Sequence, residues 1–106
     1  MQHLDNVKGK ELVPGLYGRF VHGQKLTLSF VDIQPGTLMP EHSHPHEQIT
    51  YIVEGELEMT IGGEKMVLTP GTVHVIPGNT LHSAYARTTV KLIDAFSPVR
   101  EEYIVE

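Results

Sequence analysis

Short runs of alternating apolar and polar residues fill most of the chain, and glycine or proline separates one run from the next. Alternation over about four to eight residues is typical of strands that bury one face, because successive side chains point to opposite sides. No segment shows a helical period. The pattern predicts up to eight strands: Leu16–Val21, Lys25–Ile33, Gln48–Val53, Glu56–Ile61, Glu64–Leu68, Thr72–Ile76, His82–Ala86 and Val90–Phe96.

Each turn between these strands holds a glycine, which adopts a positive φ without a clash at Cβ. The turns are His22-Gly23, Pro35-Gly36, Glu54-Gly55, Gly62-Gly63, Pro70-Gly71 and Pro77-Gly78. Many short strands with such turns predict an all-β sandwich or barrel. The last residues, Arg100–Glu106, are expected to form a charged tail that caps the barrel or pairs with a neighbour.

The composition narrows the class of protein. A length of 106 residues suits one domain spanning 1–106, and 8 basic against 13 acidic residues give a formal charge of −5. This balance argues against a nucleic-acid partner, and the absence of cysteine excludes disulfides and thiolate metal sites. The polar N-terminal stretch and the lack of a long apolar run predict a cytoplasmic protein without a membrane partner.

Histidines gather in one short tract, which suggests a metal site. His42 and His44 are two residues apart, so on a strand both imidazoles would face one cavity. Gln48 has the same parity and joins them if the chain stays extended past Pro45. A closed fold can bring His82, far along the chain, opposite this pair. These four side chains are the predicted ligands of one divalent metal ion.

Other side chains near this tract compete for the same role. His46 also has ligand parity and could replace Gln48, whereas the parity of Glu47 points it to the opposite face. Three further histidines lie outside any motif, and a structural role or none is expected for them: His3, His22 and His74.

A second group of polar candidates follows the last strand. By alternation Asp94 shares the inward face with apolar residues, where a carboxylate is costly unless it is paired or functional. It could serve as a general base beside a metal, or pair with Arg19 or Arg87. Phe96 could stack on a sugar ring or pack in the core. Arg100 could bind a substrate carboxylate in bidentate fashion or belong to a solvated tail.

Two stretches resemble the two motifs of the cupin superfamily. The first, Gly36–Gly55, matches G-x5-H-x-H-x3-E-x6-G at every spacing, with Gln48 at the glutamate position. The second, Gly71–Ala86, resembles G-x5-P-x-G-x2-H-x3-N. It matches at Gly71, Pro77 and His82, and it departs at Asn79 and Ala86. The resemblance implies a cupin jelly roll, which is a double-stranded β-helix barrel.

The stretches PGLYGRFVHG, HSHPHEQITY and DAFSPVREEY are similar to a narrower cupin group, the KdgF-type proteins of pectin and alginate breakdown. These proteins open the ring of 4,5-unsaturated monouronates to give linear keto sugar acids. The resemblance implies a small-molecule substrate, a homodimer, the metal ligands His42, His44, Gln48 and His82, and catalytic or substrate-contact roles for Asp94, Phe96 and Arg100.

The glutamine at position 48 bears on the chemistry. Three neutral imidazoles and one neutral amide leave the charge of the ion uncompensated, which strengthens its action as a Lewis acid. The resemblance also argues against iron-type dioxygenase chemistry, in which the glutamate of the cupin motif often participates. The ion could be nickel, zinc, iron, manganese or cobalt. Rival hypotheses are another metal-cupin isomerase, cyclase or dioxygenase, or a non-enzymatic binding or sensor cupin, although no helix-turn-helix pattern accompanies the domain.

Overall fold

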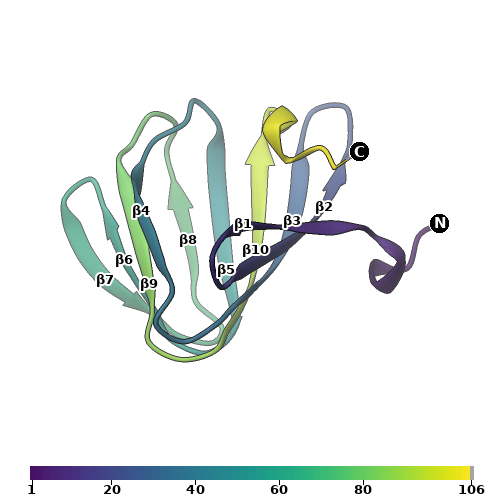
Figure 1. Ribbon diagram of the computed structural model, residues 1–106. Coiled ribbons are helices and arrows are strands. Elements are labelled where there is room, and N and C mark those ends of the chain that lie inside the picture. The colour runs from purple at the N-terminus through teal and green to yellow at the C-terminus, as the bar shows by residue number, and fades with distance from the viewer. Residues whose placement is uncertain (106) are drawn as a thin grey trace.

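The computed structural model describes residues 1–105, and two antiparallel sheets that face each other make up its body (Figure 1). The larger sheet has the strand order β1-β2-β3-β10-β5-β8, and the smaller one has the order β4-β9-β6-β7. The strands are β1 Gly9–Val13, β2 Leu16–His22, β3 Thr27–Ile33, β4 Leu38–His42, β5 Glu47–Glu54, β6 Leu57–Ile61, β7 Glu64–Leu68, β8 Val73–Ile76, β9 His82–Ala86 and β10 Val90–Ser97. The fold is therefore the all-β jelly-roll barrel that the sequence resemblance implies.

All eight expected strands are present, with ends displaced by at most two residues, and two further strands were missed. β4 contains Pro40, and its pairing with β9 is irregular between Met39 and His42. Proline within a run argues against a strand, because its nitrogen cannot donate a hydrogen bond to a neighbouring strand. β4 lies at the edge of its sheet, where a proline is tolerated. β1, also at an edge, begins with Gly9 and Lys10 and so shows no strong strand signal.

The apolar core fills one end of the barrel and leaves the other end polar. Inward-facing Ile52, Leu92 and Val31 lie on neighbouring strands and belong to the buried core. Two residues further along these strands, the same face carries the cross-strand row Thr50, Asp94 and Ser29. The inner surface of the large sheet thus changes from aliphatic to polar along the direction of β10. Figure 1 shows the end of β10 at this side of the barrel, next to the C-terminal segment.

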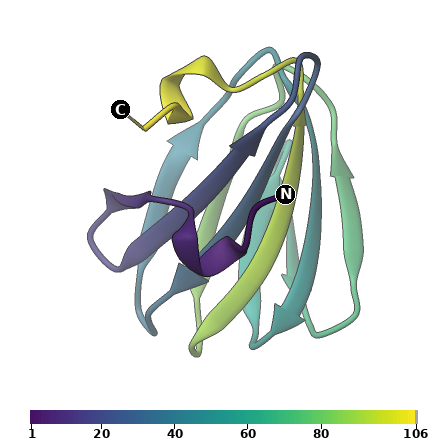
Figure 2. The ribbon, with the colours of Figure 1, turned by 90° about the vertical axis from the view of Figure 1, so that its right-hand side faces the viewer.

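The C-terminal segment folds back over this polar end. The short 3-10 helix η2, Glu101–Tyr103, lies beside the end of β10 (Figures 1 and 2). The Tyr103 ring stacks on Phe20 with 4.6 Å between centroids, and Lys10 Nζ donates to the Glu102 carbonyl at 2.8 Å. Arg100 is only 7% exposed, so the interpretation as a solvated tail was wrong. The rest of the expected tail follows η2, and its last residue, Glu106, lies outside the described residues.

Helical structure is confined, within residues 1–105, to η2 and to the 3-10 helix η1, Leu4–Asn6. Neither of these helices, at three residues each, has the length that a membrane-spanning helix requires.

Candidate metal centre and the cavity beside it

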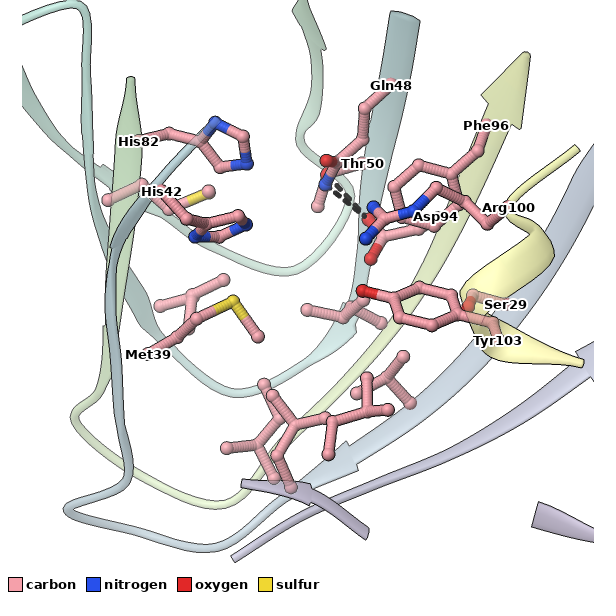
Figure 3. A pocket seen from close by; sticks show the side chains of 17 residues that line it. Ser29, Met39, His42, Gln48, Thr50, His82, Asp94, Phe96, Arg100 and Tyr103 are labelled. Carbon is pink, nitrogen blue, oxygen red and sulfur yellow. Dashed lines mark hydrogen bonds between the residues drawn. The ribbon is translucent and has the colours of Figure 1, made fainter. Parts of the chain in front are cut away.

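Three imidazoles meet at the polar end of the barrel. His42 ends β4 and His82 begins β9, and the two residues are direct cross-strand partners. Their ring centroids lie 4.3 Å apart, and the His44 ring lies 5.0 Å from His82. One ligand atom from each of the three rings lies within 4.8 Å of the others, a spacing at which all three could bind one ion. Figure 3 shows His42 and His82 at one wall of a cavity.

The second nitrogen of each ring is already engaged by the backbone. Nδ1 lies 2.9 Å from the Pro40 carbonyl in His42, and 2.8 Å from the Thr80 carbonyl in His82. In His44, Nδ1 lies 3.0 Å from the His46 carbonyl. A carbonyl can only accept, so each neutral ring carries its proton on Nδ1 and keeps a lone pair on Nε2. Such outer hydrogen bonds orient metal-binding histidines in proteins.

The Gln48 amide is oriented by its neighbours on the opposite side from the imidazoles. Its nitrogen donates to Thr50 Oγ1 at 3.0 Å and to Asp94 Oδ1 at 3.2 Å (Figure 3). Its oxygen consequently faces His44, with 3.0 Å between Oε1 and Nε2. In the neutral Nδ1–H tautomer of His44, both of these atoms are acceptors. Two acceptors at this distance suit a shared cation, so the donor set fits a divalent metal ion.

We grouped His42, His44 and Gln48 because alternate residues of an extended strand face the same side, but the strand does not continue beyond His42. β4 ends there, and residues 43–46 form the connection to β5 with a bend at Pro45 and His46. This bend brings His44 and Gln48 together, and it leaves the His46 ring beside His44, with 5.5 Å between centroids, but with Nε2 directed elsewhere. The Nε2 atom of His46 lies 3.2 Å from the Val99 carbonyl, so His46 contacts the C-terminal segment and is not part of the three-histidine cluster.

The turn of the second motif supports the connection that carries His44. The Asn79 N–H donates to the His44 carbonyl at 2.7 Å, and Asn79 has φ of 61°, a conformation that asparagine tolerates better than most residues. A Cβ on Gly78 would lie 2.4 Å from the Pro45 carbonyl oxygen. Gly78 is therefore suited to this position because the backbone of Pro45 approaches it closely. The positive φ that we expected at Gly78 is found at Asn79 instead.

Burial disfavours the protonated form of two of the clustered imidazoles. It lowers the pKa of His44 and of His82 below the ordinary value, and the positive charge of Arg100 acts in the same direction on both. Metal binding requires the unprotonated ring, so this environment favours the form that can coordinate an ion.

Asp94 lies across the cavity from His42 and His82 (Figure 3). Thr50 donates to its Oδ1 at 2.6 Å, and Gln48 donates to the same oxygen. Burial raises the pKa of Asp94 to about 6, although these two hydrogen bonds and the charge of Arg100 oppose the rise. A carboxylate with such a pKa can take up and release a proton near neutral pH.

The alternative pairing of Asp94 with surface arginines does not occur. Arg87 bonds to the carboxylates of Glu56 and Glu58, and Arg19 lies over the Tyr17 ring with 5.4 Å between Cζ and the centroid. Neither arginine is among the residues that line the cavity.

Aromatic rings hold Arg100 at the cavity. Its Cζ lies 4.7 Å from the Phe96 centroid and 4.1 Å from the Tyr103 centroid, distances at which a guanidinium is attracted to a ring face. Its Nε donates to the Glu102 carboxylate. Arg100, Phe96 and Asp94 thus line one cavity, and His42, Gln48 and His82 line it as well.

Sequence reasoning missed several residues of this cavity. Tyr103 enters from η2, and Ser29, Thr50 and Met39 line the walls. The inward parity of Ser29 and Thr50 was a usable signal, since both alternate with apolar residues on buried strands. Tyr103 carried no such signal, because it follows the last strand in a charged segment.

Comparison with known proteins agrees with this architecture. The cupin domain family matches residues 29–96, which include both the histidine cluster and Asp94. The chain belongs to the cupin family.

Within that family it is similar to KdgF-type proteins along nearly its whole length. It is 29% identical over 103 residues to the pectin degradation protein KdgF of Dickeya dadantii, with 94% of each chain covered. The structure of KdgF from a Halomonas species superposes with a TM-score of 0.85 at 33% identity and covers 92% of this chain and 91% of its own. An RmlC-like cupin from Shewanella frigidimarina gives a TM-score of 0.91 at 29% identity, with 97% and 94% covered.

Proposed function

We propose that this cupin is a metal-dependent enzyme that opens the ring of 4,5-unsaturated monouronates released from uronate polysaccharides. Similarity to two KdgF proteins over more than nine-tenths of the chain supports this reaction class. The observation that carries the proposal is the Gln48 side chain, whose amide oxygen faces the imidazoles and whose amide nitrogen holds Asp94. One residue therefore couples the candidate metal ligands to a carboxylate in the same cavity.

The cavity offers separate groups for binding and for proton transfer. A divalent ion bound by His42, His44, His82 and Gln48 would supply Lewis acidity towards a substrate oxygen. Arg100, held between two aromatic rings, is suited to bind the substrate carboxylate. Asp94 has both of its hydrogen bonds from the described residues on Oδ1, which leaves Oδ2 to exchange a proton with the substrate.

The proposed reaction is an isomerisation. Asp94 accepts the proton of the anomeric hydroxyl, and the bond between C1 and the ring oxygen breaks to give an aldehyde at C1. The enolate released at C5 takes a proton from Asp94 at C4 and becomes a ketone. Atoms and charges balance without an oxidant or reductant, and Asp94 returns to its starting form. A single positioned carboxylate contributes about 10²- to 10⁴-fold to such proton transfers.

The test follows the ultraviolet absorbance of the conjugated double bond, which the reaction removes. We expect metal-loaded protein to abolish this absorbance, a chelator to prevent the loss, and magnetic resonance to identify the linear keto acid. Asp94→Ala should abolish turnover while metal content stays unchanged. Binding of the unsaturated uronate without turnover would indicate a sensor or binding protein, and oxygen uptake would indicate a dioxygenase.

We also propose that the chain forms a homodimer through the outer face of the larger sheet. Two apolar cross-strand rows run over this face, through Phe30, Ile93, Tyr51 and Val73 in one row and Leu28, Ala95, Ile49 and Val75 in the other. Four of these side chains are exposed: Ile49, Tyr51, Val73 and Val75. A broad apolar face marks an interaction site. In a two-fold dimer the same apolar rows of two copies would face and cover each other, so we propose a second copy of this chain as the partner.

A further inference from the structure

A buried hydroxyl without a partner lies in the cavity wall opposite the histidines. Ser29, on β3, is 1% exposed, and its Oγ forms no hydrogen bond with any of the described residues. Asp94, its direct cross-strand neighbour on β10, forms hydrogen bonds with Gln48 and Thr50 through Oδ1 and none with Ser29. Leaving a buried polar atom unpaired costs free energy. Because Ser29 lines the cavity, a bound ligand can supply the missing partner.

Tyr103 adds a second hydroxyl to this wall. The ring is fixed by the stack on Phe20 and by the guanidinium of Arg100, at 4.6 Å and 4.1 Å respectively. The hydroxyl points into the cavity, towards the space between Asp94 and His42 (Figure 3). A phenylalanine would keep both packing contacts and would remove only the hydroxyl, together with its interaction with the Arg100 guanidinium.

We propose that Ser29 and Tyr103 form a subsite for ring hydroxyls, which makes the cavity selective for polyhydroxylated sugar acids. The inference rests on the proposed function. It assigns binding partners to the substrate hydroxyls that take no part in the reaction. Ring opening changes C1, C4, C5 and the ring oxygen, and Arg100 is the partner proposed for the carboxylate. The hydroxyls at C2 and C3 are left, and they need partners that can both donate and accept. Ser29 and Tyr103 offer two such groups on the wall facing the metal ligands.

The test uses two stable probes on metal-loaded protein, with binding measured by calorimetry. D-galacturonate has the ring, the carboxylate and the hydroxyls, whereas tetrahydropyran-2-carboxylate has the ring and carboxylate alone. Ser29→Ala and Tyr103→Phe each remove one hydroxyl and keep the packing. Ser97→Ala is the matched control, because Ser97 is exposed and donates to the Lys25 carbonyl outside the cavity.

We expect the unmodified protein to prefer galacturonate, and each cavity variant to weaken galacturonate binding by about five- to tenfold. Binding of tetrahydropyran-2-carboxylate should not change, and Ser97→Ala should affect neither probe. Ligand-free Ser29→Ala should melt at the same temperature or higher, because it removes an unpaired buried hydroxyl; a lower melting temperature would show a structural partner and overturn the proposal.

Unchanged galacturonate affinity in either variant, equal losses for both probes, or no galacturonate binding by the unmodified protein would also overturn the subsite. Failure of the proposed reaction is a separate result. A protein that leaves unsaturated uronates intact, yet keeps a galacturonate preference that depends on Ser29 and Tyr103, would contradict the ring opening and support the subsite.

Discussion

The Gln48 amide donates to the Asp94 carboxylate at 3.2 Å, across 46 residues of sequence. This hydrogen bond decides which end of the amide faces the imidazoles. With the nitrogen towards Asp94, the oxygen lies 3.0 Å from His44 Nε2. A flipped amide would set its oxygen against the carboxylate. The amide is therefore both a candidate ligand and the neighbour that positions the candidate general base.

Replacing the Gln48 amide by a carboxylate separates its role as a metal ligand from its role in positioning Asp94. In Gln48→Glu, metal should remain bound, because a carboxylate is also a good ligand. Turnover should fall by at least about 10²-fold, since the new charge lies against Asp94 and disfavours its ionised form. Elemental analysis and the absorbance assay measure the two effects. Glu47→Gln, on the exposed neighbouring position, is the control, and turnover of Gln48→Glu at the unmodified rate would remove Gln48 from this role.

Asp94 should make the stability of the metal-free protein depend on pH. Its pKa is about 6 in the folded chain and 3.8 ordinarily, so folding disfavours the ionised form. As pH falls from 7 to 4, the folded state binds this proton first, and the free energy of unfolding gains a favourable contribution of at most about 3 kcal/mol.

Asp94→Asn removes the ionisation, so it should stabilise the metal-free protein at pH 7 by up to the same amount, about 3 kcal/mol, and the advantage should shrink towards pH 4. Urea unfolding at several pH values, with chelator present, measures the difference. An advantage that is constant with pH, or one that grows as pH falls, would contradict the assignment of the pKa shift to this carboxyl group.

His46 and His44 should respond differently to truncation. His46→Ala is expected to keep the metal stoichiometry and lose about 1–2 kcal/mol of stability, because the contact with the Val99 carbonyl is lost. His44→Ala should lose most of the metal. Elemental analysis and thermal melting distinguish these results, with His3→Ala as an exposed control. Loss of metal from His46→Ala would restore His46 as a ligand.

The proposed homodimer depends on an exposed apolar face and is sensitive to charge. Val73→Glu and Tyr51→Glu place a carboxylate within it and should shift the mass in solution, measured by light scattering, from dimer to monomer. Val67→Glu is the matched control, because Val67 is an exposed valine on β7 of the other sheet. A monomeric unmodified protein, or a dimer that survives both substitutions, would contradict this interface.

Alternation predicted the strands wherever one face is buried and the other exposed. β5 follows this rule over most of its length. It failed for β4, because Pro40 and an irregular pairing interrupt the period at an edge. The same failure hid the local cause of the histidine cluster: spacing selected His44 and Gln48, but a bend in the chain, and not an extended strand, brings them together.

Contacts between distant segments lay beyond the reach of the sequence. The position of Tyr103 depends on Phe20, more than eighty residues earlier, and on the cation–ring contact with Arg100. No local periodicity reports such a contact. Similarly, alternation predicts that Ser29 faces inward. Only the three-dimensional arrangement reveals that its hydroxyl has no hydrogen-bond partner among the described residues.

The carbonyls that orient the three imidazoles all come from residues two positions away, at Pro40, His46 and Thr80. The orientation of each imidazole therefore depends on a hydrogen bond within three consecutive residues. Substitutions elsewhere in the barrel do not remove these hydrogen bonds. The Gln48 amide instead takes part of its direction from Asp94 on β10, a strand distant in the sequence, as well as from Thr50 on its own strand. Ion capture in such a barrel can persist while mutations on β10 alter the chemistry, which gives evolution, or a protein engineer, a stable starting point for new reactions.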